Sequence, residues 1–132
     1  MTAVSIVTPS CQPEEERLRA GIRALEEAGF QVKTGALAFE ARPHTVEEDQ
    51  RRAREFEDAL LDPETEAVLC ARGGYGVARL LDFVDWERLA GCTKRFCGYS
   101  DLTTLHGILE RRVPSLSRAY GPMAACRMLE KR

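Results

Sequence analysis

One serine occupies a position that suits a catalytic nucleophile. Ser100 stands in Gly98-Tyr99-Ser100-Asp101, between an apolar, strand-like run and a helical segment. A sharp strand-to-helix turn exposes a serine hydroxyl, and the positive end of the following helix favours an alkoxide-like transition state. The pattern matches only half of the nucleophile-elbow signature, because Leu102 replaces its second glycine. Capping of the helix by Ser100 or Asp101 is the structural alternative.

A glycine-rich turn, Arg72-Gly73-Gly74-Tyr75-Gly76, follows another apolar run. It differs from a dinucleotide-binding fingerprint, because Arg79 stands where the third glycine belongs, and it lacks the Gly-Lys-Ser/Thr of a phosphate loop. Such a backbone can approach a ligand closely and donate N–H groups to a developing oxyanion. A tight turn that binds no ligand remains the alternative.

A nucleophilic serine needs a base, and neither histidine of the chain suits that role. His106 lies six residues after Ser100 on the expected helix, a rise of about 9 Å. With Glu110 it forms an i, i+4 pair that we expect to be exposed rather than to bind a metal. His44 lies beside Pro43 in a loop and is expected to be solvated. The residues alone therefore leave the base unassigned.

The order of elements predicts the scaffold. Strand-like runs occupy residues 3–7, 30–32, 67–71 and 95–98, and helical segments separate them. Thr45 and Glu48 form a capping box at the start of one helix, while Pro13 and Gly29 suit the start and end of another. This alternation predicts a doubly wound α/β domain with a mostly parallel sheet, in which ligands gather where strands end and helices begin.

Composition narrows the class of protein. The 132 residues are 44% hydrophobic and 30% charged, which suits one compact domain. The net charge of −2 argues against nucleic acid and anionic membranes as partners. No apolar stretch approaches the ~20 residues of a membrane span, and the start resembles no secretion signal, so we expect a cytoplasmic protein.

Two further residue classes are expected to have no catalytic role. The five cysteines contain no Cys-x-x-Cys pair, and Cys70 and Cys97 stand in apolar runs, as buried small hydrophobes do. The doublets Arg51-Arg52 and Arg111-Arg112 stand among glutamates on helices and are expected to face solvent.

Three ordered motifs resemble the amino-terminal domain of the LD-carboxypeptidase family of serine peptidases. They span residues 71–81, 98–106 and 121–123, and the stretches 4–10 and 47–71 fit the same family. The family includes muropeptide LD-carboxypeptidases and microcin C immunity peptidases. The resemblance implies a flavodoxin-like amino-terminal domain over residues 1–132, with the histidine and glutamate of the base in a carboxy-terminal domain that is absent from this chain. The sequence differs from the family pattern at Tyr120, where members often carry histidine.

The resemblance also implies roles for residues. Ser100 would be the nucleophile, and the amides of Gly74 and Asp101 would form the oxyanion hole. The expected substrate contacts are Arg72, Gly73, Tyr75 and Tyr99. The implied reaction cleaves the L,D-amide to the terminal D-alanine of murein tetrapeptides, without metal or cofactor, in a homodimer that binds a muropeptide or related small peptide.

Three other functions remain open. The chain could be a non-catalytic binding module derived from this fold, or it could act on a microcin C-type peptidyl nucleotide. A flavin- or nucleotide-binding, flavodoxin-like protein is the third, although the phosphate-loop pattern is missing. For the hydrolase, we expect little or no turnover by this chain alone.

Overall fold

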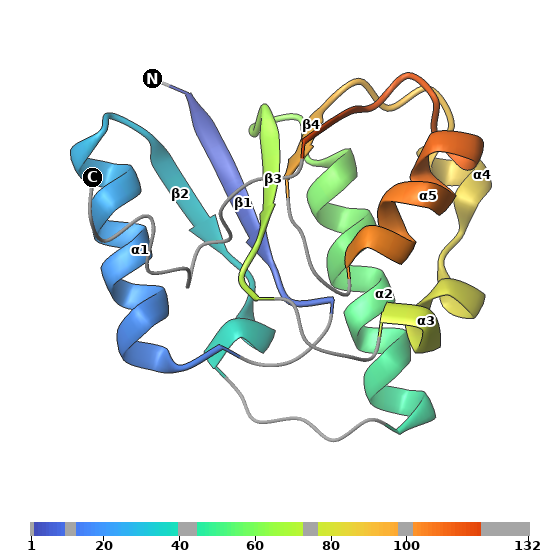
Figure 1. Ribbon diagram of the computed structural model, residues 1–132, viewed down its shortest axis with the longest axis horizontal. Coiled ribbons are helices and arrows are strands. Elements are labelled where there is room, and N and C mark those ends of the chain that lie inside the picture. The colour runs from blue at the N-terminus through green and yellow to red at the C-terminus, as the bar shows by residue number, and fades with distance from the viewer. Residues whose placement is uncertain (1, 10–12, 40–44, 73–76, 98–101, 120–132) are drawn as a thin grey trace.

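The computed structural model describes residues 2–9, 13–39, 45–72, 77–97 and 102–119. Five parallel strands form one sheet in the order β2-β1-β3-β4-β5 (Figure 1). The strands are β1 (Ala3–Val7), β2 (Gln31–Thr34), β3 (Ala67–Cys70), β4 (Arg95–Cys97) and β5 (Ser117–Ala119). The predicted α/β class with a parallel sheet is therefore confirmed.

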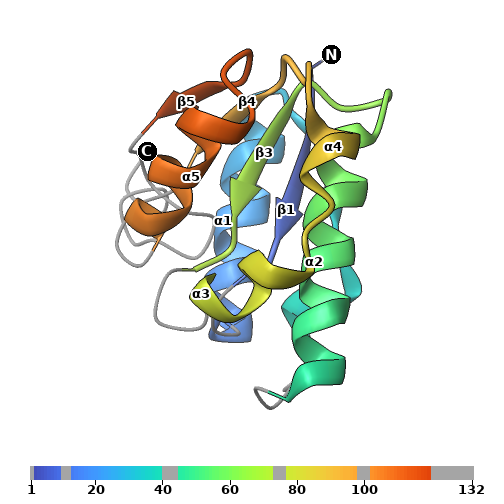
Figure 2. The same cartoon turned by 90° about the vertical axis from the view of Figure 1, so that its right-hand side faces the viewer.

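Helices lie on both faces of this sheet (Figure 2). On one face lies α1 (Glu15–Glu27); on the other lie α2 (Val46–Leu61), α3 (Val77–Leu80), α4 (Trp86–Leu89) and α5 (Leu102–Arg112). Two short 3-10 helices, η1 (Ala36–Phe39) and η2 (Leu81–Phe83), complete the elements. This arrangement is doubly wound, as predicted. None of the helices in the described ranges is long and apolar enough to cross a bilayer.

The larger of two hydrophobic clusters joins the sheet to α2, α3, α4 and α5. Phe56 of α2 and Phe96 of β4 are fully buried, and their rings meet edge to face with centroids 5.9 Å apart. Leu109 of α5 is buried in the same cluster. Burying each such side chain stabilises the fold by about 1.5–3 kcal/mol. This cluster therefore holds α2 and α5 at fixed positions relative to β4.

The strand β3 is covered unevenly by the described residues. Val68 and Cys70, on the face of the larger cluster, are fully buried, whereas Ala67 and Leu69 on the α1 face are partly buried. Ala67 and Leu69 line an apolar groove of about 300 Å³ together with Phe30 and side chains of β4. The described residues therefore bury one face of β3 fully and the other face only partly.

Local chemistry explains where the first two helices begin and end. The Thr45 hydroxyl accepts a hydrogen bond from the Glu48 N–H at 3.2 Å, which confirms the predicted cap of α2. Gly29 follows α1 with φ of 98°, a conformation that suits glycine at a helix end. The predicted start of α1 at Pro13 was wrong by two residues, because the helix begins at Glu15.

Two elements were missed by the sequence-based prediction. Strand β5 has the sequence Ser117-Arg118-Ala119, which lacks an apolar run and β-branched residues. The 3-10 helix η1 follows β2, in a stretch for which the sequence predicts neither a strand nor a helix. Both are short, and both depend on tertiary contacts: β5 pairs with β4, and η1 contacts β1.

Removing the cap of α2 should lower stability measurably. Thr45→Ala leaves the Glu48 N–H without its side-chain acceptor, so we expect a loss of about 1 kcal/mol in the free energy of unfolding. Urea denaturation followed by circular dichroism measures this change. Thr93→Ala, at an exposed site outside the helices, is the matched control and should change stability by less than about 0.5 kcal/mol. Equal stability of the two variants would contradict the capping role.

Candidate active site

The edge of the sheet between β3 and β4 is where the two sequence motifs begin. These strands are parallel neighbours, with Leu69 opposite Cys97. The glycine-rich motif starts two residues after Cys70, and the serine motif follows Cys97 directly. Because parallel strands end at the same edge, β3 and β4 point toward their two motifs from neighbouring positions. This is the edge at which ligands collect in doubly wound folds.

Most of the predicted site residues lie outside the described part of the chain. These residues are Gly73, Gly74, Tyr75, Tyr99, Ser100 and Asp101. Arg72 is described and is exposed, and Tyr120 again lies outside the described ranges, as does His44. The nucleophile, the oxyanion hole and the substrate contacts therefore stay predictions.

The helix α5 supports the nucleophile prediction through its placement. It begins at Leu102, two residues after Ser100, and its 11 residues are anchored in the larger cluster by Leu109. The amino end of a helix carries a partial positive charge from its unpaired N–H groups. An anion formed near residues 98–101 would therefore meet a favourable field.

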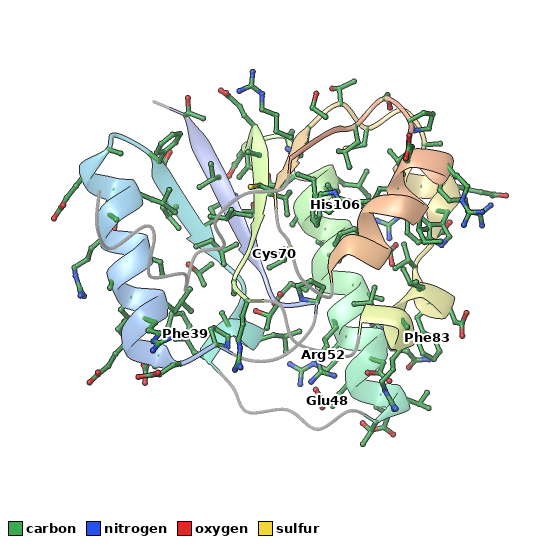
Figure 3. All side chains as sticks on the ribbon, viewed as in Figure 1. Phe39, Glu48, Arg52, Cys70, Phe83 and His106 are labelled. Carbon is green, nitrogen blue, oxygen red and sulfur yellow. The ribbon has the colours of Figure 1, made fainter. Side chains whose placement is uncertain are left out.

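The histidine of α5 is part of the core. His106 extends from α5 toward the sheet (Figure 3) and is 1% exposed. Its ring packs on Phe96, with ring centroids 5.4 Å apart and an angle of 68° between the ring planes. The expectation of an exposed pair with Glu110 was therefore wrong. The reason is its spacing of three residues from the buried Leu109, which puts both side chains on the inner face of α5. Among the described residues, no group of three or more potential ligands could hold a metal ion.

The cysteines that end β3 and β4 are unsuited to nucleophilic chemistry. Burial raises the pKa of the Cys70 thiol well above its usual value, and burial also raises the pKa of Cys97. Neither forms a disulfide, and only a thiolate is a good nucleophile. The prediction that Cys70 is a buried small hydrophobe is confirmed, whereas Cys97 is half-buried. A serine nucleophile meets no competitor from these two residues.

A buried ionic cluster ties α2 to the helix that follows the glycine-rich motif. Asp49 accepts a hydrogen bond from Arg52 at 3.2 Å through Oδ1 and from Arg79 of α3 at 2.9 Å through Oδ2. The side chains of Asp49 and Arg52 are 3% and 5% exposed. The expectation that Arg52 faces solvent was therefore wrong, whereas Arg51 is exposed as expected. Residues 49, 52, 53, 56 and 60 share one helical stripe, which would have revealed this burial.

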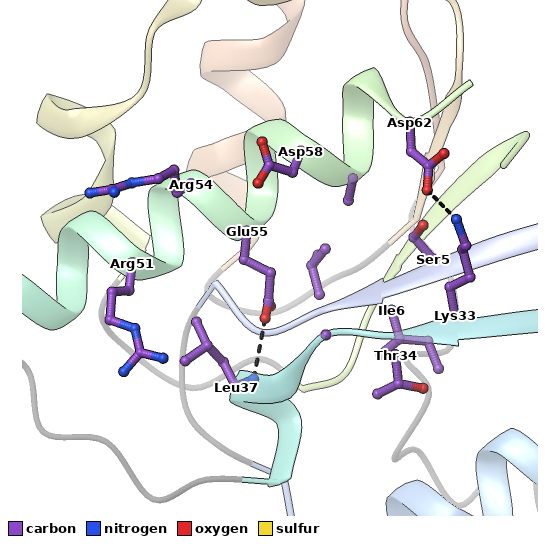
Figure 4. A pocket seen from close by; sticks show the side chains of 13 residues that line it. Ser5, Ile6, Lys33, Thr34, Leu37, Arg51, Arg54, Glu55, Asp58 and Asp62 are labelled. Atoms are coloured by element: carbon purple, nitrogen blue, oxygen red, sulfur yellow. Dashed lines mark hydrogen bonds and ion pairs between the residues drawn. The ribbon is translucent and has the colours of Figure 1, made fainter. Parts of the chain in front are cut away.

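A cleft of about 470 Å³ opens between α2 and the first two strands (Figure 4). The charged side chains that line it are Lys33, Arg51, Arg54, Glu55, Asp58 and Asp62. Lys33 pairs with Asp62 at 2.8 Å across one end. The carboxylate of Glu55 instead accepts hydrogen bonds from the backbone N–H groups of Thr8 and Leu37. No motif in the sequence indicated these two contacts. The cleft is lined by β1, β2, η1 and α2, and none of its lining residues belongs to β3 or β4.

Relatives of known name are similar to most of this chain. A carboxypeptidase homologue from Streptomyces coelicolor is 40% identical over 128 residues, which is 92% of this chain and 40% of that protein. The murein tetrapeptide carboxypeptidase of Pseudomonas aeruginosa is 30% identical over 122 residues, or 92% of this chain and 39% of that protein. The microcin C7 self-immunity protein MccF of Escherichia coli is 28% identical, covering 86% of this chain and 33% of its own length. The chain thus spans about two fifths or less of these relatives.

Solved structures show the same fold. An MccF-like protein from Bacillus anthracis is 26% identical with a TM-score of 0.85, over 99% of this chain and 40% of that one. The muramoyltetrapeptide carboxypeptidase of Oxalobacter formigenes is 28% identical with a TM-score of 0.78, over 93% of this chain and 40% of that one.

A family model confirms the resemblance that the three motifs predicted. Residues 4–121 match the model described as the LD-carboxypeptidase N-terminal domain. The match includes the strands β3 and β4 together with both motifs that follow them. The chain therefore belongs to the LD-carboxypeptidase family, through the N-terminal domain of that family.

Proposed function

We propose that this chain is the nucleophile-bearing part of a serine carboxypeptidase that releases the terminal D-alanine from murein tetrapeptides. Family membership and the name of the Pseudomonas aeruginosa relative support this function. The main structural support for this function is the parallel pairing of β3 with β4. The glycine-rich motif follows β3 and the serine motif follows β4, so both motifs begin at one edge of the sheet.

In the proposed mechanism, the Ser100 hydroxyl attacks the carbonyl carbon of the L,D-amide. The hydroxyl proton passes to a histidine that a glutamate orients, both from a carboxy-terminal domain, and then to the leaving nitrogen of D-alanine. The amides of Gly74 and Asp101 stabilise the negative oxygen of the tetrahedral intermediate. Water then hydrolyses the acyl-enzyme, which releases the tripeptide and restores the serine. The substrate contacts proposed with them are Arg72, Gly73, Tyr75 and Tyr99.

The similarity to MccF supports a second candidate function. Its name and that of the Bacillus anthracis structure connect this fold with self-immunity to microcin C7. The same nucleophile and oxyanion hole would serve a peptidyl-nucleotide substrate, because the bond that is cut is again an acyl bond. The two candidates differ in the ligand, so a substrate comparison separates them.

The proposal includes the cytoplasm as the site of action and a homodimer as the assembly. The cysteines in the described part of the chain, Cys70, Cys92 and Cys97, form no disulfide, which is usual for proteins of a reducing compartment. The homodimer rests on the family resemblance, and sedimentation of the purified protein would test it.

The experiment joins this chain to the remaining carboxy-terminal part of the Streptomyces coelicolor relative, since the two are 40% identical over the shared domain. The joined protein should release D-alanine from murein tetrapeptide, measured with a coupled D-amino-acid oxidase assay. The 132-residue chain alone and the carboxy-terminal part alone should each stay near background, because each lacks half of the catalytic residues.

Each result favours a different conclusion. Rapid D-alanine release by the chain alone would contradict a base supplied from outside it. Cleavage of a peptidyl nucleotide without cleavage of the tetrapeptide would favour the second candidate. Peptide binding without cleavage in the joined protein would favour a non-catalytic binding module.

A further inference from the structure

The carboxylate of Glu55 connects the backbone segment that follows β1 with the segment that follows β2. Its Oε1 accepts from the Thr8 N–H at 2.8 Å, and its Oε2 accepts from the Leu37 N–H at 3.3 Å. Figure 4 shows the contact with Leu37. Thr8 follows β1 directly, and Leu37 lies in η1, which follows β2. One side chain of α2 thus holds the chain at the carboxyl ends of two neighbouring strands.

The surroundings of Gly35 show how closely this carboxylate fits. A Cβ atom added at Gly35 would lie 2.5 Å from Cδ and 3.1 Å from Cγ of Glu55, and closer still to Oε2. Any side chain at position 35 would therefore displace the carboxylate from its two donors. Glycine is needed at this position because it has no side chain. Its backbone conformation is not the reason, since its φ lies outside the left-handed region.

The segment held by Glu55 borders the edge from which the proposed catalytic motifs leave. Strand β1 pairs with β3 with Val7 opposite Cys70, and the Ala71 N–H donates to the Val7 carbonyl at 2.8 Å. Thr8 is therefore beside Ala71, one residue before the glycine-rich motif begins. Thr8 is 3% exposed, and its hydroxyl has no hydrogen-bond partner among the described residues. The position of Thr8 thus depends on its backbone contacts.

We propose that Glu55 is a positioning residue, which holds the segment after β1 and the segment after β2 at the rim of the substrate site and loosens them when it is protonated. The connection to substrate rests on the proposed function. The connection between the two segments does not, and it can be measured without turnover.

The chemistry of a carboxyl group explains the dependence on protonation. An ionised carboxylate accepts hydrogen bonds at both oxygens, whereas the acid form turns one oxygen into a donor. With one N–H donor at each oxygen, the ionised form satisfies both donors best, because the hydroxyl oxygen of the acid is a weaker acceptor than a carboxylate oxygen. Protonation therefore weakens the contact to Thr8 or the contact to Leu37.

Desolvation by burial is the largest influence on Glu55 and raises its pKa above the ordinary value of 4.5. The N–H groups of Thr8 and Leu37 and the charges of Arg51 and Arg52 act in the opposite direction. The other charged groups lining the cleft are Lys33, Arg54, Asp58 and Asp62. Burial therefore destabilises the ionised form in the folded state, while the two N–H donors favour that form locally. Because the folded state binds the proton more tightly than the unfolded state, the global stability linked to this proton is complete below about pH 4.5 and is lost as the pH rises through the folded pKa, whereas the local contacts to Thr8 and Leu37 are made best above that pKa.

The test uses the ¹⁵N-labelled 132-residue chain and NMR. From pH 4 to pH 8, the amide protons of Thr8 and Leu37 should shift with one common midpoint above 4.5. Glu55→Gln should abolish this common titration, because it removes the ionisable group and replaces one acceptor by a donor. Asp58→Asn, which removes an exposed carboxylate of the same cleft, is the matched control and should keep the titration.

A second variant covers the case in which Glu55→Gln fails to fold. Gly35→Ala keeps the carboxylate but displaces it, so it should also remove the common titration of the two amides. The proposal is overturned if these amides do not titrate together in the unmodified chain. It is also overturned if they still do so in Glu55→Gln.

The part that concerns substrate is tested in the joined enzyme. Glu55→Gln should lower kcat/KM for the tetrapeptide about tenfold, chiefly through KM, since a small displacement of binding groups weakens substrate positioning. An unchanged KM at pH 7 would restrict Glu55 to a role in the fold and overturn its role at the substrate site. If the joined protein without any substitution showed no activity, the proposed function would be contradicted. The NMR result on the link between the two segments would still stand.

Discussion

Replacing Ser100 by alanine in the joined enzyme should lower kcat for D-alanine release by about a thousandfold or more. The change removes the only atom that forms the covalent bond in the proposed mechanism, so the acyl-enzyme cannot arise. KM should change little, because the hydroxyl contributes to the transition state rather than to the binding of the peptide. The measurement is the initial rate of D-alanine release at several tetrapeptide concentrations.

Ser115→Ala is the matched control for this variant. Ser115 is exposed and precedes β5, so it lies at the opposite edge of the sheet from the carboxyl end of β4. Its hydroxyl donates to the Cys92 carbonyl at 2.6 Å. We expect this variant to keep at least about half of the activity, as surface substitutions usually have small effects. A Ser100→Ala enzyme with more than a tenth of the control's rate would contradict the nucleophile assignment.

Local patterns in the sequence were sufficient to predict most of the scaffold. The apolar run at 67–71 produced β3, and the stripe of Ala53, Phe56 and Leu60 produced the buried face of α2. The N-cap at Thr45 was predictable because both partners lie within four residues of sequence. Strand β5 was not, because its three residues form a strand only through pairing with β4.

The candidate site at the carboxyl ends of β3 and β4 could be predicted only in part. The serine and glycine motifs are local, and a parallel sheet brings the ends of neighbouring strands together, so their common edge followed from the fold class. The burial of Arg52 and His106 did not follow, because charge and polarity suggested solvent while helical position decided the outcome. The contact of Glu55 with Thr8 spans 47 positions and involves a backbone donor, which leaves no trace in residue types.

Replacing the buried Asp49 should strongly destabilise the protein. Asp49→Ala removes a carboxylate that faces Arg52 inside the protein and Arg79 on α3. Breaking a buried ion pair leaves a charge in a poorly solvated place, so we expect a loss of about 3–5 kcal/mol in the free energy of unfolding. Urea denaturation of the 132-residue chain measures it.

Two further variants separate the buried part of this cluster from its exposed part. Arg79→Ala should lower stability by about 1 kcal/mol or less, because the Arg79 side chain is 46% exposed and its pairing is screened by water. Asp58→Asn, on the exposed side of the same helix, should have almost no effect. If Asp49→Ala were as stable as Asp58→Asn, the ionic cluster would have no structural role.

A compensating substitution tests the physical cause. In Asp49→Ala/Arg52→Met the buried guanidinium is gone together with its carboxylate, so much of the lost stability should return. The double variant still lacks the contact between α2 and Arg79. Arg79 stands three residues after the last glycine of the glycine-rich motif. In the joined enzyme, we therefore expect the double variant to be stable and yet slower than the unmodified protein, since α3 has lost a contact that fixes its position relative to α2. Full activity in a stable double variant would show that this contact contributes to folding alone.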